Sequence, residues 1–224
     1  MKNILVISVH PDDETLGCGG TILKHKENGD AIFWLILTGP TENHPYGFSK
    51  EMIQDRESEI KKISKMFGFQ KTINLNFPTQ LLDEINLRDI IVKIDQAVND
   101  VKPNIVYLIN RSDIHSDHRI GFDAAYSCTK NFRKSFIDKI LMYETLSETE
   151  FAPALSENAF IPNVFVDVSD YMERKLEIMS IYSSEMMPDN LPRSHSAINA
   201  LATYRGSRIG VQYAEAFMLL FEKC

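Results

Sequence analysis

The feature that most constrains the fold of this chain is a repeated alternation between short, fully apolar runs and longer amphipathic segments. Residues 4–9, 31–37 and 105–109 form runs rich in β-branched and large aliphatic side chains. Because a run without polar alternation is typical of a strand buried on both faces, these runs predict a parallel sheet. Further strands are expected at residues 72–77, 139–143 and 164–168, and helices at residues 16–27, 50–67, 87–101, 116–132 and 171–182.

The order of these segments predicts the fold class. A strand, a helix and a second parallel strand form a right-handed crossover, which places the helices on the faces of the sheet. We therefore expect an α/β protein, a three-layer α/β/α sandwich with a Rossmann-like, mostly parallel sheet. The 224 residues fit a single domain, residues 1–224, whose pattern becomes less regular from about residue 146. Residues 211–221 suit a strand and a helix equally well.

The charge and the cysteines limit the partners and the compartment. The chain has 24 basic and 31 acidic residues, a formal net charge of −7, and no dense basic cluster. Since nucleic-acid binding needs concentrated positive charge, no nucleic-acid partner is expected. Cys18, Cys128 and Cys224 are odd in number and widely spaced, which favours a reducing, cytoplasmic location. Residues 4–9 are too short for a signal peptide or a membrane span, so no membrane partner is expected either.

Two polar clusters follow predicted strands, at points where helices are expected to begin. The first is His-Pro-Asp-Asp-Glu at residues 10–14, and the second is Asp-Ile-His-Ser-Asp-His at residues 113–118. In an open α/β sheet, ligands bind beyond the carboxyl ends of the strands. A catalytic zinc takes three protein ligands and keeps one position open. His10 with one of the two following aspartates, together with His115 or His118, would supply such a set.

A simpler interpretation of each cluster is a helix cap. Carboxylates at a helix N-terminus accept hydrogen bonds from free backbone N–H groups, which would explain Asp12 and Asp13 without a metal. Capping does not explain why histidine and aspartate occur together at two separate strand ends. We therefore favour a metal site, and the lack of any need for a structural metal in a chain of this size favours a catalytic one.

Rival functions fit the sequence less well. A dinucleotide-binding turn would need a third glycine where Ile22 stands, and an acidic residue after the second strand instead of Thr38-Gly39. The Gly-x-Ser-x-Gly motif of serine hydrolases is absent. Few fixed cations accompany the clusters, which disfavours phosphoryl transfer. The alternatives that stay open are a metal-dependent hydrolase of a non-sugar amide and a non-catalytic metal-binding protein.

The two clusters resemble the motifs of the LmbE-like, or PIG-L, de-N-acetylases. The first family motif is His-Pro-Asp-Asp-Glu after a strand, continued here by Thr-Leu-Gly-Cys-Gly-Gly-Thr at residues 15–21. The second is His-x-Asp-His, found at residues 115–118 with Ser116 where the family usually has proline. Residues 205–217 resemble the C-terminal signature of the family. The resemblance thus spans nearly the whole chain and implies an LmbE-like α/β fold.

The resemblance implies a role for each residue of the two motifs. It makes the chain a hydrolase in which a water on the metal attacks the amide carbonyl of an N-acetyl group. One Zn²⁺ per chain is implied, with ferrous iron as an alternative in the cell. The implied metal ligands are His10, Asp13 and His118. The implied catalytic residues are Asp12 as general base, a protonated His115 at the oxyanion, and Asp117, or instead Asp113, as the group that orients His115.

The resemblance also implies the class of substrate, an N-acetyl amino sugar or sugar conjugate of the N-acetylglucosamine type. Arg56 and His195 resemble substrate-binding residues of the family, although Arg56 would equally suit an ion pair with Glu59 one helical turn away. Specificity is expected to lie in residues 38–49 and in the proline-broken residues 148–194. The irregular C-terminal third leaves room for a homo-oligomer interface without defining one.

Overall fold

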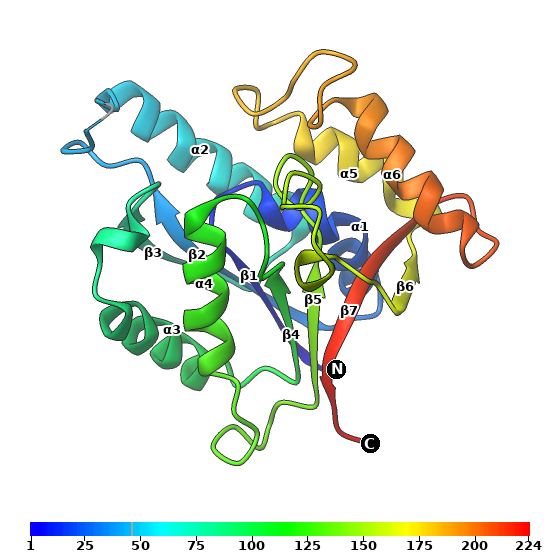
Figure 1. Ribbon diagram of the computed structural model, residues 1–224, viewed down its shortest axis with the longest axis horizontal. Helices are drawn as coiled ribbons and strands as arrows, with labels where there is room; N and C mark the ends of the chain where they lie inside the picture. Colours follow the sequence, from blue (N-terminus) through cyan, green and yellow to red (C-terminus); the bar gives the residue numbers. More distant parts are fainter. Residues whose placement is uncertain (46) are drawn as a thin grey trace.

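The computed structural model describes residues 1–45 and 47–224, which form a seven-stranded sheet between two layers of helices (Figure 1). The strands are β1 (Asn3–Ser8), β2 (Ala31–Gly39), β3 (Lys71–Pro78), β4 (Ile105–Ile109), β5 (Lys139–Tyr143), β6 (Val164–Asp167) and β7 (Ala214–Glu222). The α-helices are α1 (Asp13–Glu27), α2 (Lys50–Phe67), α3 (Leu87–Val101), α4 (Ser116–Ser127), α5 (Met172–Met179) and α6 (His195–Ser207). Short 3₁₀ helices are η1 (Leu82–Glu84), η2 (Ser156–Asn158) and η3 (Ser169–Tyr171).

The sheet is mostly parallel, as the apolar runs predict. Its strand order is β3-β2-β1-β4-β5-β7-β6, and the first five strands of this order are parallel to one another. Only β7 runs antiparallel, between β5 and β6. The central strand β1 is buried along nearly its whole length, since helices cover both faces of the sheet. The expected three-layer α/β/α sandwich is confirmed.

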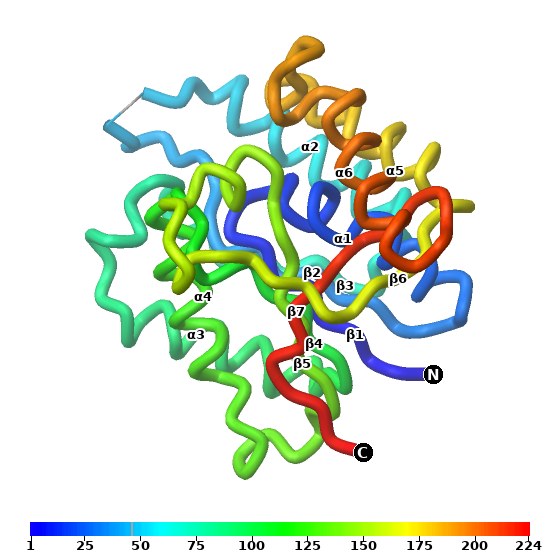
Figure 2. Tube along the Cα trace, turned by 45° about the vertical axis from the view of Figure 1, so that its right-hand side comes forward, coloured from blue at the N-terminus to red at the C-terminus, as the bar shows by residue number. Residues whose placement is uncertain are grey.

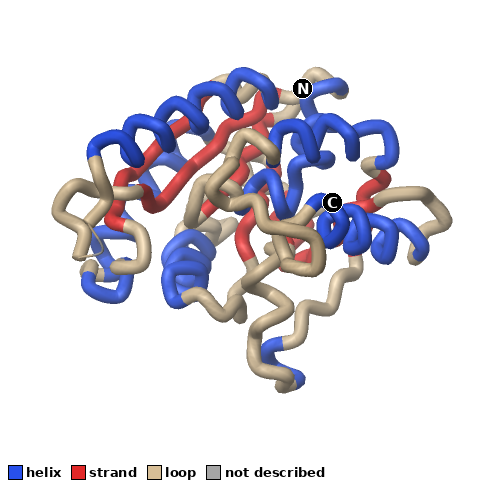
Figure 3. The backbone as a smooth tube through the Cα atoms, turned by 90° about the horizontal axis from the view of Figure 1, so that it is seen from above, coloured by secondary structure: helices blue, strands red, loops and turns tan. Residues whose placement is uncertain are grey.

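The two layers are formed by different sets of helices. Helices α3 and α4 pack together on one face, whereas α1 packs against α2 and α5 on the other, with α6 resting on β6 and β7 (Figure 1). Seen from above, helices lie on both sides of the strands (Figure 3). Because β7 is antiparallel, its last residues pair with the start of β5. Both chain ends therefore lie at the edge opposite the carboxyl ends of the parallel strands (Figure 2).

The structure corrects several element boundaries. The helix expected at residues 116–132 ends at Ser127, and the one expected at 171–182 is limited to Met172–Met179. Residues 211–221, which suited two assignments, contain the start and nearly all of β7, a strand. Helix α6 was not expected at all, because its buried face consists partly of small residues, Ala202 and Gly206, which give weak hydrophobic periodicity.

Helix α1 is bent, and the bend brings it close to its neighbours. Cys18 interrupts the helix with non-helical backbone angles, φ −144° and ψ 22°. Gly17, just before the bend, lies so close to the ring of Tyr143 that a Cβ atom there would overlap the ring. The absence of a side chain at residue 17 therefore allows α1 to approach β5. Lys175 and Glu215 bind backbone groups of α1 on either side of the bend.

Two further expectations concern the chain as a whole. Within residues 1–45 and 47–224, no helix is long and apolar enough to cross a membrane. Cys18 and Cys128 are buried, Cys224 is exposed, and all three cysteines are free.

Candidate metal centre and active site

The two polar clusters meet at the carboxyl ends of β1 and β4. These strands are adjacent in the sheet, and the chain leaves them toward opposite sides, β1 toward β2 and β4 toward β5. A switch point of this kind opens a crevice in α/β sheets. The cluster at residues 10–14 follows β1 and starts α1, while the cluster at residues 113–118 follows β4 and starts α4. The fold thus brings together two motifs separated by about a hundred residues of sequence.

Three side chains from these clusters point their donor atoms at one position. Nδ1 of His10 lies 3.2 Å from Nε2 of His118, which in turn lies 3.3 Å from Oδ1 of Asp13. One ligand atom from each residue falls within 4.8 Å of the others. Two imidazoles and one carboxylate with converging lone pairs match the ligand set of a catalytic zinc, so these residues fit the metal that the resemblance implies.

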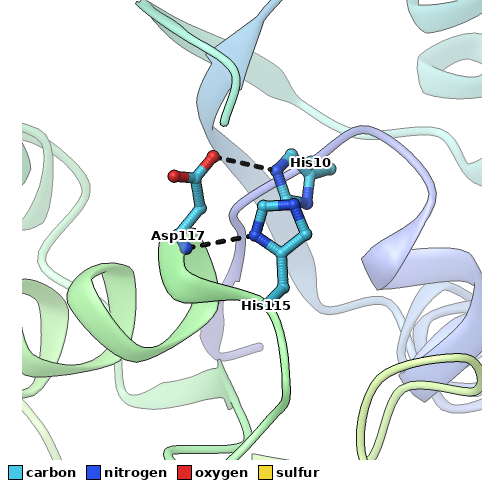
Figure 4. Close-up of side chains that lie close together, drawn as sticks. All are labelled: His10, His115 and Asp117. Carbon is cyan, nitrogen blue, oxygen red and sulfur yellow. Dashed lines mark hydrogen bonds and ion pairs between the residues drawn. The ribbon is translucent and has the colours of Figure 1, made fainter. Parts of the chain in front are cut away.

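The far side of each imidazole is held by a carboxylate. Nε2 of His10 is 3.2 Å from Oδ2 of Asp117, and Nδ1 of His118 is 2.8 Å from Oδ2 of Asp113. Figure 4 shows the carboxylate of Asp117 directed at His10. Metal-binding histidines commonly donate their second N–H to a carboxylate, which fixes the tautomer that presents a lone pair to the ion. Both histidines have this support.

A second set of donors, His10, His115 and Asp117, also lies within 4.8 Å. The carboxylate of Asp117, however, already accepts hydrogen bonds from the backbone N–H groups of Gln80 and Leu82, at 2.5 and 3.1 Å. Both oxygens of Asp117 are occupied, whereas the two backbone N–H groups that Asp13 accepts both bind its Oδ2, which leaves Oδ1 for a metal. The set with Asp13 and His118 is therefore the better candidate.

Asp13 has the charge that a metal ligand needs. Its Oδ2 accepts the backbone N–H groups of Val9 and His10 at 2.9 and 2.8 Å, which leaves Oδ1 directed at His118. Burial alone would raise the pKa of Asp13, but the charge and hydrogen bond of His118, with help from His10, lower it to about 2. Asp13 is thus an anion throughout the neutral range.

The neighbouring Asp12 has an unusual backbone and an unusual carboxyl group. Its φ of 131° lies in the region that non-glycine residues rarely adopt, at a cost of about 1–3 kcal/mol. The side chain is 7 % exposed, and burial together with the charge of Asp13 raises its pKa well above the usual range, against the opposing charge of Arg193. Arg193 reaches Asp12 with an Nη1–Oδ2 distance of 3.5 Å. A carboxyl group that readily takes a proton thus lies beside the metal ligands.

Glu14 holds the backbone of Asp12 in place through a hydrogen bond. Its Oε2 accepts the N–H of Asp12 at 3.1 Å, while its Oε1 accepts the hydroxyls of Thr15 and Tyr182 at 2.5 and 3.0 Å. Burial raises the pKa of Glu14 to about 7, although these hydrogen bonds act in the opposite direction. Glu14 therefore acts as a hydrogen-bond acceptor inside the protein, and its side chain does not reach the cavity.

His115 differs from the expectation of a protonated imidazole. Burial and the charges of His10 and His118 lower its pKa to about 4, so the ring is neutral at pH 7. Its Nδ1 accepts the backbone N–H of Asp117 at 3.1 Å, as Figure 4 shows. The proton of the neutral ring is therefore on Nε2. The carboxylate of Asp113 lies on His118 instead of His115, where Asn110 and Thr149 each donate to its Oδ1 at 2.7 Å.

A cavity of about 530 Å³ opens over these residues, within the usual range of small-molecule sites. Both segments expected to set specificity contribute to its wall, residues 38–49 through Phe48 and residues 148–194 through Glu185 and Arg193. Residue 46, in the first of these segments, lies outside the described residues. The two segments lie about a hundred residues apart in the sequence, so the wall forms only in the folded protein.

Of the two substrate-binding residues expected from sequence, the structure places one at the cavity. Arg56 lines it, with Nε 3.4 Å from Glu59 and Nη2 paired with Glu185. The ion pair with Glu59 and the position at the cavity are therefore both present. His195 begins α6, is exposed, and contacts Oγ of Ser180 at 2.9 Å from a position outside the cavity lining.

Sequence reasoning missed the residue that takes this place, Arg193. It lies two positions before His195, in Arg-Ser-His-Ser at residues 193–196, so the resemblance points to the right segment while the structure places Arg193, and not His195, in the cavity wall. Among the described residues, Nε of Arg193 and Oγ1 of Thr145 are buried without a hydrogen-bond partner, although both residues line the cavity through other atoms.

Comparison with known proteins agrees with the motifs. Residues 5–129 match the family model PIG-L, described as GlcNAc-PI de-N-acetylase, and this match contains both polar clusters. The chain belongs to the PIG-L family. The resemblance inferred from the two motifs is thereby confirmed.

Relatives within the PIG-L family cover most of the chain. The diacetylchitobiose deacetylase of Thermococcus kodakarensis is 29 % identical over 96 % of this chain and 82 % of its own length. An uncharacterized deacetylase of Escherichia coli, YaiS, is 32 % identical over 82 % of this chain and 91 % of its own length. The solved N,N'-diacetylchitobiose deacetylase of Pyrococcus horikoshii has the same fold, with a TM-score of 0.75 and 23 % identity over 98 % of this chain and 84 % of that one.

Proposed function

We propose that this protein is a metal-dependent deacetylase that hydrolyses the N-acetyl group of an amino sugar or sugar conjugate. The observation that carries the proposal is the convergence of donor atoms from His10, Asp13 and His118 beside the carboxyl group of Asp12, at the base of a cavity. The names of the PIG-L relatives support the reaction, since those that match over most of the chain are called deacetylases.

His10, Asp13 and His118 would hold one Zn²⁺, or ferrous iron in the cell. When bound, such an ion supplies Lewis acidity toward the amide carbonyl and makes water a better nucleophile at neutral pH. The contributions of the chain itself are the three donors, the carboxylates of Asp113 and Asp117 that orient the imidazoles, and the groups described next.

Asp12 is the proposed general base. It lies in the cavity wall next to the metal ligands, and its rotated backbone turns the carboxyl group away from the helix that it precedes. It would take the proton of the water that attacks the amide carbonyl and return it to the departing amine. A carboxyl group whose pKa is raised by burial is a stronger base than an ordinary aspartate, which suits the acceptance of a proton from water.

His115 is the proposed oxyanion donor, in its neutral form. Since Nδ1 accepts the N–H of Asp117, the ring presents Nε2–H as its donor. A fixed N–H directed at the carbonyl oxygen stabilises the negative charge that develops there. Asp117 serves twice, through its N–H toward His115 and through its carboxylate toward His10.

Sugar hydroxyls would complete the polar wall of the cavity. Each hydroxyl both donates and accepts a hydrogen bond, so it can bind the guanidinium groups and carboxylates that line the cavity. Arg193 and Arg56 are the two arginines of this wall. His195 is left out of the proposed set because it contacts Ser180 beyond the cavity.

The test is acetate release from a panel of N-acetyl sugars by the zinc-loaded protein, with simple non-sugar acetamides in parallel. Asp12→Asn is expected to lower kcat by about 10²–10⁴-fold while the zinc content is unchanged. Asp100→Asn, which removes an exposed carboxylate of α3, is the matched control. Full activity of Asp12→Asn would exclude Asp12 as the base. Acetate release from the non-sugar amides alone would exclude a sugar substrate.

A further inference from the structure

The cavity has a strong excess of negative charge. The described residues that line it include no lysine, two arginines, Arg56 and Arg193, three histidines and six acids. Two of the histidines would be neutral as metal ligands, and the third, His115, is neutral because its pKa is lowered to about 4. The six acids are Asp12, Asp13, Asp55, Glu59, Glu148 and Glu185. A divalent cation on the three metal ligands would reduce this excess without removing it. The substrate therefore enters a negative field, which a narrow cavity strengthens.

Both arginines of the cavity are already engaged by these acids. Arg56 is paired with Glu59 and Glu185, and Nη1 of Arg193 lies 3.2 Å from Oε2 of Glu185. A phosphate or carboxylate on the substrate would compete with these acids for the two guanidinium groups. The cost would include leaving Glu185 unpaired in a partly buried position.

Two of the acids, in contrast, have no cation. In the part of the chain that the structure describes, neither Asp55 nor Glu148 forms an ion pair or a side-chain hydrogen bond. Asp55 lies on α2 one turn before Glu59, a spacing at which like charges destabilise a helix. Glu148 lies in the loop after β5 and is only partly exposed. A helix and a loop thus each present an unpaired carboxylate to one cavity.

We propose, on the basis of the deacetylase function above, that this cavity selects its substrate by charge. It takes N-acetyl amino sugars joined to an amine-bearing or neutral group and rejects those joined to a phosphate or carboxylate, with Asp55 and Glu148 as the specificity-determining residues. The cavity is larger than an acetamide group, so residues at its rim contact what the acetylated sugar is attached to. A free amine on a second sugar unit supplies the ammonium donors that unpaired carboxylates bind.

The test uses three disaccharides that carry the same acetylated sugar and differ in charge. N-acetylglucosamine is β-1,4-linked to glucosamine, to glucose or to glucuronic acid, and kcat/KM for acetate release is measured with zinc-loaded protein at low and high salt. The expected order is glucosamine, then glucose, then glucuronic acid, with roughly tenfold or more between the first and the last at low salt. Salt is expected to narrow this range. Equal values, or the reverse order, would overturn the charge selection.

Variants locate the selection in the two unpaired acids. Asp55→Asn with Glu148→Gln is expected to reduce the glucosamine-to-glucuronic-acid ratio several-fold. The matched control, Asp100→Asn with Glu173→Gln, removes two exposed carboxylates outside the cavity and is expected to leave the ratio unchanged. A ratio that both double variants lower equally, or that neither lowers, would exclude Asp55 and Glu148 as the determinants.

Binding separates this inference from the deacetylase function. Analogues of the three disaccharides with glucose in place of the acetylated sugar cannot react and carry no new charge, so calorimetric titration of the zinc-loaded protein measures the charge preference alone. The same order of affinities supports the selection even if no acetate is released from any substrate, in which case only the deacetylase function fails. Hydrolysis with no charge preference in either measurement would instead leave the function and overturn the selection.

Discussion

Two buried clusters of charged residues in the described part of the chain differ in whether the charges within each cluster neutralise one another. Lys175 and Glu215, each 4 % exposed at the side chain, form one cluster with an Nζ–Oε1 distance of 2.7 Å. Lys175 also donates to the carbonyl of Leu16 at 2.8 Å, while Glu215 accepts the N–H groups of Gly20 and Thr21 at 2.8 and 2.7 Å. The other cluster is the candidate metal centre, where His10, Asp13 and His118 direct their lone pairs at one another.

The difference shows that burial and charge by themselves do not indicate function. In the first cluster the cation and the anion neutralise each other, and the remaining contacts bind backbone groups on either side of the bend at Cys18 in α1. In the second cluster three donor atoms converge at one position, which is the arrangement that a divalent cation needs. The self-satisfied cluster supports the helix, and the open cluster at the start of that helix is the candidate metal centre.

The largest expected effect comes from removing one donor of the open cluster. His118→Ala is expected to abolish stoichiometric zinc binding and, with it, activity, because only two ligands are left. His115→Ala is expected to retain zinc and to lower kcat by about 10²-fold through loss of an oxyanion donor. Elemental analysis of both purified variants, with kinetics, checks the difference. Equal loss of zinc in the two would mean that His115 is also a ligand.

Substitutions in the Lys175–Glu215 cluster are expected to change the stability of the protein. Lys175→Met leaves Glu215 buried without its cation and is expected to lower the free energy of unfolding by about 3–5 kcal/mol. Urea unfolding of the zinc-free protein measures this loss. Adding Glu215→Gln is expected to restore part of it, since the unpaired charge is then removed. Loss of zinc affinity in folded Lys175→Met without loss of stability would break the distinction between the two clusters.

Glu14 lies between the two cases, since it is buried and is held by neutral hydrogen bonds only. Its pKa of about 7 lies above the usual 4.5, so the folded state binds more protons than the unfolded chain between about pH 4.5 and 7. Stability therefore falls as the pH rises through this window, by up to about 3 kcal/mol from this group. The difference between wild type and Glu14→Gln, measured by urea unfolding of the zinc-free protein, should change across this window. A pH-independent difference would show that Glu14 is ionised in the folded state.

A smaller effect on zinc binding is expected from changing a carboxylate that holds one of the candidate metal ligands. Asp113→Asn keeps the shape of the residue that holds Nδ1 of His118 and is expected to weaken zinc binding by about 10–100-fold. Competition with a chelator of known affinity measures this change. Asp123→Asn removes an exposed carboxylate of α4 outside the cavity lining and serves as the control. An unchanged affinity in Asp113→Asn would mean that packing alone orients His118.

Local signals explain why much of the fold was predictable. The buried strands of the parallel sheet are short and continuous in sequence, and so are the two polar clusters at their ends. The positions of α2 and α3 followed from apolar periodicity and matched the structure residue for residue. Helix α6 could not be found in this way, because its contacts with β6 and β7 use small side chains.

The parts of the site that escaped prediction depend on packing between distant segments. Arg193 reaches Asp12, and Glu185 reaches Arg56, only because the C-terminal third folds over α1 and α2. The partner of each imidazole was also beyond the sequence, since spacing cannot decide whether Asp113 or Asp117 turns toward a given ring. The tautomer of His115 depends on one backbone N–H, that of Asp117. Such assignments require coordinates.

The anchoring of α1 by Glu215 sets an order of events during protein synthesis. The N–H of Gly20 and the carboxylate that binds it are separated by 195 residues. At a typical elongation rate of about 5–20 residues per second, the ribosome needs roughly 10–40 s to produce that interval. The helix that begins at the candidate metal ligands is therefore made early and secured late. Until β7 is made, β5 lacks its antiparallel neighbour and Glu215 cannot hold the bend of α1, so the candidate metal-binding motif is synthesised long before the contacts that anchor its helix.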